Sequence, residues 1–229
     1  MKIEVLTDTD AVARKAAAIV AAQARAAVST RGRFLFAVSG GRTPWQVLQK
    51  LAAEEIPWEG VQIIQVDERV APTGHADRNL THLRESLLEH APLPPENIHA
   101  MSVEAADLDA AARQYAELLE RIAGAPPMLD LVHLGLGADG HTASLVPGDP
   151  VLDVTNDDVA VTGPYQGRRR MTLTYPLINR AHSILWLVTG GEKSDALRRL
   201  RAADPSIPAG RVRQDSALVL ADDAAAADL

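Results

Sequence analysis

The feature that most constrains the fold is an alternation of short β-branched or aromatic runs with longer stretches of Ala, Leu and Arg at helical spacing. This alternation is typical of βαβ units and a mainly parallel sheet. It predicts strands over 3–6, 33–39, 61–67, 129–136, 170–174, 183–189 and 217–221, and helices near 10–29, 44–53, 79–89, 105–123, 176–180 and 191–202. No Gly/Ser linker divides the 229 residues, so we expect a single α/β domain over 1–229.

Three segments do not fit the alternation. The proline-rich stretch 91–98 and the polar stretch 147–168 read as excursions rather than domain boundaries. The terminal residues 222–229, DDAAAADL, are expected to fray.

Composition and charge exclude several classes of partner. A net charge of −7 disfavours a nucleic-acid partner, and Arg168, Arg169 and Arg170 alone do not form a nucleic-acid face. No apolar run is long enough to span a bilayer, and the first residues, MKIEVLTDTD, do not resemble a signal peptide. We therefore expect a cytoplasmic protein without a membrane partner. The absence of cysteine agrees with this, and a local basic site for a small anion remains compatible with the charge.

The loop VSGGRTPWQVL, residues 38–48, has the composition of a phosphate site. Its glycines allow the backbone to approach a ligand, Thr43 suits an N-cap, Pro44 suits the first helical position, and Gln46 could close a capping box. Backbone N–H groups at a helix N-terminus attract phosphate. The alternative is a capped turn without a ligand.

The loop QVDERVAPTGHADRN, residues 65–79, places charge at the end of an apolar strand. Asp67, Glu68 and Arg69 would lie where the carboxyl ends of parallel strands meet, which is where open α/β sheets bind ligands. A solvated strand end is the alternative. Asn79 is expected to open the next helix as a cap.

The stretch HLGLGADGHTASLVPG, residues 133–148, contains GxGxxG at 135, 137 and 140. A dinucleotide fingerprint belongs to an early βαβ unit with an acid about 20 residues further on, closing a strand. Here the match lies past the midpoint of the chain and Asp158 stands in polar sequence, so we reject that interpretation. Asp139 and His141 instead suggest an acid–base pair at the start of a short helix, whose dipole would keep the imidazole neutral.

The loop LVTGGEKSDAL, residues 187–197, supplies a cation. Thr189 and Glu192 could form a capping box, with Lys193 in or near the first helical turn. A cation there opposes the helix dipole unless an anion lies nearby, so Lys193 is a candidate phosphate ligand. Arg170 could supply a second cation.

Other kinds of chemistry lack support in the sequence. There is no cysteine nucleophile, and Ser39 and Ser144 lack the GxSxG setting of a nucleophile elbow. The histidines at 75, 82, 90, 99 and 133 show no metal-ligand spacing. The residues alone therefore predict metal-free acid–base chemistry on a small phosphorylated molecule.

Five motifs in this order resemble the 6-phosphogluconolactonase family over nearly the whole chain. They are SGGRTP (39–44), VDERV (66–70), GLGADGHTASLVPG (135–148), RMTLTYPLIN (170–179) and TGGEK (189–193). The resemblance implies a Rossmann-like α/β fold shared with glucosamine-6-phosphate deaminases. It also implies hydrolysis of 6-phospho-D-glucono-1,5-lactone to 6-phosphogluconate in the oxidative pentose phosphate pathway, with no cofactor.

The resemblance also implies roles for individual residues. The phosphate would be held by Ser39, Gly40, Gly41, Thr43, Arg170 and Lys193. His141 would take a proton from the attacking water, with Asp139 orienting the imidazole or contacting the sugar. Asp67 and Arg69 would line the reacting end, where Arg69 either stabilises the oxyanion or only orients the substrate.

Two other functions are weighed against this one. The related deaminase pattern, DGHIAFNEP, has a glutamate five residues after the histidine, where this chain has Val146, and valine cannot move a proton. A non-catalytic sugar-phosphate sensor would be free to lose His141 and would normally carry a DNA-binding segment, which the sequence before Ser39 does not resemble.

Two positions depart from the usual lactonase pattern. Arg78 replaces a common serine, which affects the loop before Asn79, and Val146 replaces a common phenylalanine. Alanine-rich helix faces suit either solvent or a partner, so the sequence predicts no particular oligomeric state.

Overall fold

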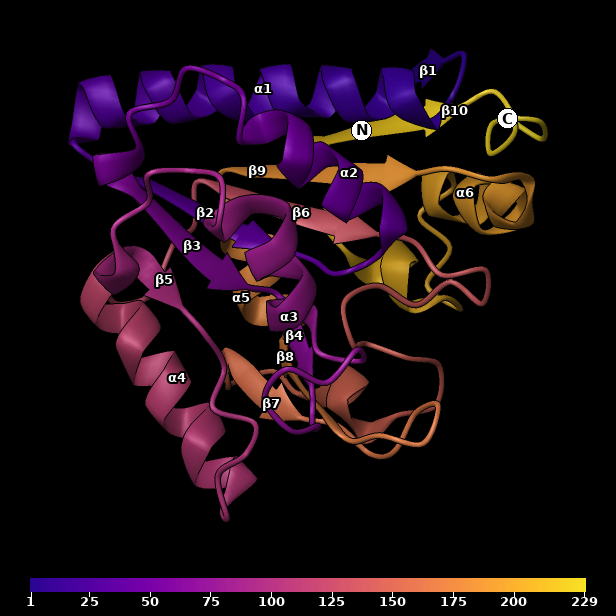
Figure 1. The fold of residues 1–229 in the computed structure, drawn as a ribbon. Coiled ribbons are helices and arrows are strands. Elements are labelled where there is room, and N and C mark those ends of the chain that lie inside the picture. Colours follow the sequence, from indigo (N-terminus) through magenta and orange to yellow (C-terminus); the bar gives the residue numbers. More distant parts are fainter.

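A computed structural model describes residues 1–229 and contains a seven-stranded, entirely parallel sheet in the order β1-β10-β9-β6-β2-β3-β5. The arrowheads of β6, β9 and β10 in Figure 1 point to the same side of the molecule, where their following loops gather. The first and last strands lie side by side. The strands are β1 (Lys2–Leu6), β2 (Phe34–Val38), β3 (Val61–Gln65), β5 (Ile98–His99), β6 (Leu131–Gly135), β9 (Ser183–Val188) and β10 (Ala217–Asp222).

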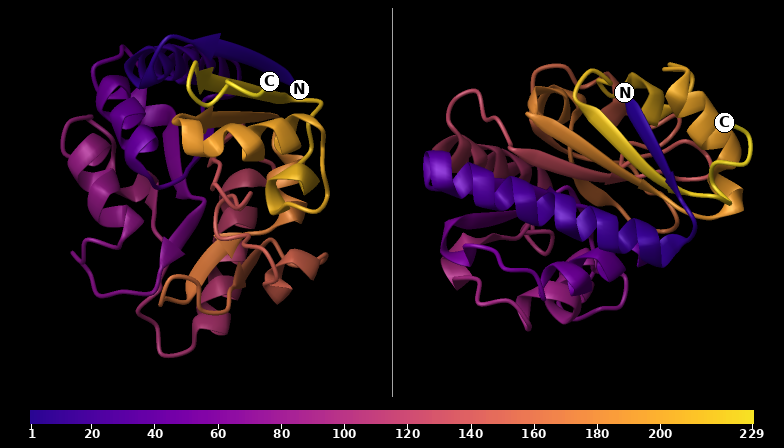
Figure 2. Two further views of the ribbon diagram at one scale, coloured as in Figure 1. Left: turned by 90° about the vertical axis from the view of Figure 1, so that its right-hand side faces the viewer. Right: turned by 90° about the horizontal axis from the view of Figure 1, so that it is seen from above.

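Helices cover both faces of this sheet because its strands carry apolar residues on both sides. One core packs α1 (Thr9–Arg31) and α2 (Arg42–Leu51) on residues such as Phe34 and Phe36, and Figure 2 shows α1 lying across the strands. The other core packs α4 (Leu108–Ala123), α5 (Tyr175–Arg180) and α6 (Ser194–Arg201) on the opposite face. The predicted mainly parallel α/β architecture is confirmed.

A second, smaller sheet was not predicted. It is antiparallel, in the order β4-β8-β7, with β4 at Asp67–Arg69, β7 at Val159–Val161 and β8 at Arg170–Leu173. The predicted strand 61–67 therefore breaks after Gln65, and the predicted strand 170–174 joins this sheet rather than the parallel one. The periodicity of apolar residues predicts that a segment is a strand but not which strand it pairs with, so the sequence did not separate the two sheets.

Several boundaries also differ from the prediction. The predicted helix 79–89 is α3 (Asn79–Leu83) followed by a π-helical turn, Arg84–Leu88. The two segments predicted to be irregular also contribute strands: β5 begins at the end of 91–98, and β7 lies within 147–168. Short 3₁₀ turns occupy Trp58–Gly60, Pro95–Asn97, Pro150–Asp153, Gly191–Lys193 and Pro208–Arg211.

The tail 222–229 is packed rather than frayed. The Asp222 carboxylate accepts the N–H of Ala225, whose side chain is fully buried, and the Asp222 carbonyl accepts the N–H of Ala226. No helix combines the length and apolar character needed to cross a membrane.

Candidate active site

A cleft of about 610 Å³ lies at the carboxyl edge of the parallel sheet. Loops from both sheets converge on it, as expected for an open α/β fold. Nine of the ten predicted site residues line the cleft. The tenth, Asp139, does not line it but contacts His141, which does. The nine are Ser39, Gly40, Gly41, Thr43, Asp67, Arg69, His141, Arg170 and Lys193; the lining also includes Thr9, Arg42, Gln46, Asn79, Thr189 and Glu192.

The loop after β2 forms one wall of the cleft. Ser39 donates from Oγ to the carbonyl of His133 at 2.7 Å, which ties this loop to β6. Gly40 packs against Asn79 so closely that an added Cβ would lie 1.9 Å from Oδ1. Glycine at this position is therefore required by the contact with α3.

The predicted cap of α2 is wrong. The helix begins at Arg42 with Gly41 as N-cap, at φ 124°, and no side chain caps it. Thr43 instead contacts Thr189, with 2.6 Å between the two hydroxyl oxygens, so it joins the β2 and β9 loops. An uncapped N-terminus leaves backbone N–H groups without side-chain acceptors at the cleft, which suits an anion.

The loop after β9 brings Lys193 into the cleft. Its ammonium lies 3.9 Å from Glu192 Oε1, its nearest carboxylate. The predicted capping box of Thr189 and Glu192 does not form. Instead the Gly190 N–H donates to both oxygens of Asp222, at 3.0 and 3.1 Å. Sequence reasoning missed this role of Asp222 because it assigned that residue to a frayed tail.

The carboxylates of Asp67 and Glu68 have different surroundings although they are adjacent. Asp67 lines the cleft and accepts from Ser144 Oγ at 2.6 Å and from Asn79 Nδ2 at 3.2 Å. Glu68 is completely buried, where it accepts the N–H groups of Asn79 and Leu80. Glu68 thus caps α3, a role predicted for Asn79, whose side chain instead donates to Asp67.

Arg69 and Arg170 are directly opposite one another across the antiparallel pair β4 and β8. Arg69 donates to the Asp77 carbonyl at 2.9 Å and Arg170 to Gln166 Oε1 at 3.4 Å, so neither is paired with a carboxylate, and the Nε of each is buried without a hydrogen-bond partner. Burial, followed by the charge of Arg69, lowers the pKa of Arg170 below its usual value. Two adjacent guanidinium groups without a carboxylate partner in one cleft favour binding of an anion.

His141 contacts Asp139 through Nδ1, with 2.5 Å between Nδ1 and Oδ1. Burial raises the pKa of Asp139, but hydrogen bonds from His141 and Tyr165 and the imidazole charge outweigh it and lower this pKa below its usual 3.8. The predicted short helix after His141 is absent, since residues 142–149 form turns. The expected effect of a helix dipole on the imidazole is therefore wrong, and Asp139 is its electrostatic partner.

Tight packing of glycines shapes the loop that carries this pair. A Cβ on Gly137 would lie 2.1 Å from His141 Nδ1, and one on Gly140 would lie 2.5 Å from Ile207 Cβ. The Gly137 N–H also donates to the His141 carbonyl at 2.8 Å. Of the three glycines that spell GxGxxG, Gly137 allows the close approach of the histidine and Gly140 allows the contact with Ile207.

Tyr165 completes the group, and no sequence pattern pointed to it. Its hydroxyl donates to Asp139 Oδ2 at 3.0 Å, from a segment read as a polar excursion. Only the register of β7 and β8 brings this residue to Asp139.

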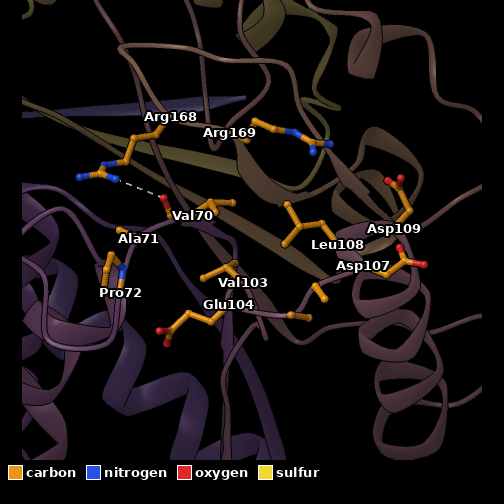
Figure 3. A pocket seen from close by; sticks show the side chains of 12 residues that line it. Val70, Ala71, Pro72, Val103, Glu104, Asp107, Leu108, Asp109, Arg168 and Arg169 are labelled. Carbon is orange, nitrogen blue, oxygen red and sulfur yellow. Dashed lines mark hydrogen bonds between the residues drawn. The ribbon is translucent and has the colours of Figure 1, made fainter.

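A second hollow of similar volume lies between the residues after β4, the start of α4 and the residues before β8 (Figure 3). Half of its lining is apolar, and Arg168 in its wall is already paired with Asp77. It contains none of the predicted site residues. No cluster of three or more His, Asp or Glu side chains is arranged to hold a metal ion.

Comparison with known proteins shows the family of the chain. The sequence profile described as glucosamine-6-phosphate isomerases/6-phosphogluconolactonase matches residues 7–220. The chain belongs to this family. A relative named 6-phosphogluconolactonase from Synechocystis is 38% identical over 210 residues, covering 89% of this chain and 87% of its own length.

Solved structures of known proteins share the fold. A 6-phosphogluconolactonase from Thermotoga maritima has a TM-score of 0.86 and 27% identity, covering 96% of this chain and 98% of its own. A monomeric glucosamine-6-phosphate deaminase has a TM-score of 0.87 and 19% identity over 100% of both chains. The predicted relation to the deaminase fold is confirmed.

Proposed function

We propose that this family member hydrolyses 6-phospho-D-glucono-1,5-lactone to 6-phospho-D-gluconate, a step of the oxidative pentose phosphate pathway. The observation that carries the proposal is the contact of His141 with Asp139 in a cleft that also holds unpaired cations. The Synechocystis relative bears the name of this activity. The substrate carries a phosphate and a reactive carbonyl, which require an anion site and a base in one cleft.

His141 is the proposed general base. Asp139 accepts two hydrogen bonds besides the imidazole contact, from the His141 N–H and from the Tyr165 hydroxyl. An ionised carboxylate only accepts, so Nδ1 carries the hydrogen and Nε2 holds the free lone pair. This tautomer leaves Nε2 available to take a proton from water.

The reaction needs one water and no cofactor. Water attacks the lactone carbonyl carbon as His141 Nε2 takes its proton, giving a tetrahedral oxyanion beside a charged imidazolium. The oxyanion collapses, the bond to the ring oxygen breaks, and the imidazolium returns the proton to that oxygen. Asp139 stabilises the imidazolium between these two steps.

The remaining residues bind and orient the substrate in this proposal. Ser39, Gly40, Gly41, Thr43 and Lys193 belong to the two loops joined by the Thr43–Thr189 contact and hold the phosphate together with Arg170. Asp67 lies at the reacting end beside Arg69, whose guanidinium is assigned to the developing oxyanion. An Arg69→Lys variant that retained kcat and lost only affinity would contradict the oxyanion role.

The test adds purified protein to freshly made lactone and follows 6-phosphogluconate formation above the spontaneous rate. Acceleration should fall by roughly 100-fold or more in His141→Ala. The matched control is His182→Ala, because His182 is exposed and does not line the cleft. No acceleration by the wild type, with ammonia released from glucosamine 6-phosphate, would replace the proposal with deamination. Inactivity toward both, with retained binding of sugar phosphate, would indicate a sensor.

A further inference from the structure

A tight hairpin turn holds Tyr165 against Asp139 and His141. Tyr165 and Arg168 exchange backbone hydrogen bonds of 3.0 and 3.3 Å, and the two residues between them, Gln166 and Gly167, have φ of 52° and 79°. Positive φ at both central positions is the pattern of a type I′ turn, which matches the twist of antiparallel strands. This turn fixes the direction from which Tyr165 approaches the site.

The Tyr165 side chain touches three groups of the proposed machinery. Its hydroxyl donates to Asp139 Oδ2 at 3.0 Å, on the oxygen that does not contact His141 Nδ1. Its ring meets the His141 ring edge-on, with centroids 5.5 Å apart. The Arg170 guanidinium carbon lies 4.9 Å from the centre of the same ring, a cation–π distance.

The need for such a residue follows from the exposure of Asp139. The Asp139 side chain is 40% exposed, so without a fixed donor water would compete for Oδ2 and the carboxylate could rotate about its Cβ–Cγ bond. With a donor on each oxygen the carboxylate plane is fixed, and with it the direction of the imidazole. Burial and then the hydrogen bond to Asp139 raise the pKa of the Tyr165 phenol, so it remains a donor at neutral pH.

We propose that Tyr165 is a positioning residue that holds Asp139, and through it the reactive tautomer of His141, while its ring supports Arg170. The kinetic part of this proposal depends on the lactonase function proposed above. The tautomer part does not, because it concerns the resting protein.

The first test measures the imidazole nitrogens of His141 by ¹⁵N NMR without substrate. The wild type should show Nδ1 protonated and Nε2 unprotonated. Tyr165→Phe keeps the ring and removes only the donor, so it should shift His141 toward a mixture of tautomers. Identical ¹⁵N spectra in the two proteins would overturn the proposal, whether or not the protein hydrolyses the lactone.

The second test compares kcat and KM. Tyr165→Phe should lower kcat by roughly 10-fold with KM unchanged, because small misplacements of a base cost rate. Tyr165→Leu also removes the ring from Arg170 and should lower kcat/KM further. The matched control is Tyr115→Phe, because that phenol bonds only backbone groups, those of Gln65 and His99, and should leave kcat unchanged. Equal losses in Tyr115→Phe and Tyr165→Phe would indicate a general structural effect and overturn the assignment.

Discussion

Asp139 Oδ1 lies 2.5 Å from His141 Nδ1 and also accepts the backbone N–H of the same histidine at 3.1 Å. One carboxylate oxygen therefore fixes both the main chain and the ring of the residue proposed as base. Because both contacts come from the Asp139 side chain, a substitution of Asp139 is expected to disturb the main chain and the ring of His141 together.

Asp139→Asn should lower kcat by roughly 10³-fold, since an amide can donate to Nδ1 and favour the unreactive tautomer. Binding should be little affected, because Asp139 does not line the cleft. Lactone hydrolysis and equilibrium binding of 6-phosphogluconate check the two parts separately. A variant that bound product normally and retained near-wild-type kcat would show that Asp139 does not orient the base.

Gly137→Ala should inactivate the protein without unfolding it. The new methyl would lie 2.1 Å from His141 Nδ1 and 2.6 Å from Asp139 Oδ1, so the pair must separate. Hydrolysis and thermal unfolding, measured side by side, distinguish displacement of the pair from loss of the fold. Ala138→Ser is the control, because Ala138 is exposed, adjacent and outside the cleft lining. An active Gly137→Ala protein would mean that the contact at Gly137 is not needed.

Much of the site was predictable because parallel strands place their following loops at one edge. Ser39, Asp67, His141 and Lys193 were each assigned to such a loop from local sequence, and the structure brings all four to one cleft. Local patterns sufficed here because strand polarity alone decides where a following loop lies.

The remaining features depend on contacts between distant segments. Tyr165 reaches Asp139 only through the antiparallel pairing of β7 with β8. Asp222 reaches Gly190 because β10 lies beside β9. The caps at Thr43 and Asn79 were wrong because tertiary partners, Thr189 and Asp67, took up those side chains.

Glu68→Gln should destabilise the protein by roughly 3 kcal/mol, because it removes the buried one of the two carboxylates paired with Arg78 and places an amide donor against backbone N–H groups. Glu68 is fully buried, pairs with Arg78 Nε at 3.1 Å and caps α3. Urea unfolding gives the change in free energy of unfolding. The control is Glu104→Gln, because Glu104 also pairs with Arg78 but its side chain is 51% exposed. Equal effects of the two substitutions would contradict the importance given to the buried carboxylate.

The buried imidazole of His133 should make stability depend on pH. Burial lowers the pKa of His133 from its usual 6.5 to about 4, and its Nε2 is buried without a partner. Between these values the unfolded chain binds the proton and the folded protein does not. The free energy of unfolding therefore gains up to about 1.4 kcal/mol per pH unit from this group as pH rises, and its contribution is complete above pH 6.5.

Carboxylates titrate in part of the same range, so the prediction concerns the difference between wild type and His133→Leu. That variant keeps an apolar contact with Phe36, on which the imidazole stacks at 6.5 Å, and removes the titrating group. Urea unfolding at several pH values should give a shallower dependence for His133→Leu than for wild type. His182→Ala, which changes an exposed histidine, should retain the wild-type slope. Parallel curves for wild type and His133→Leu would mean that His133 is not kept neutral by the fold.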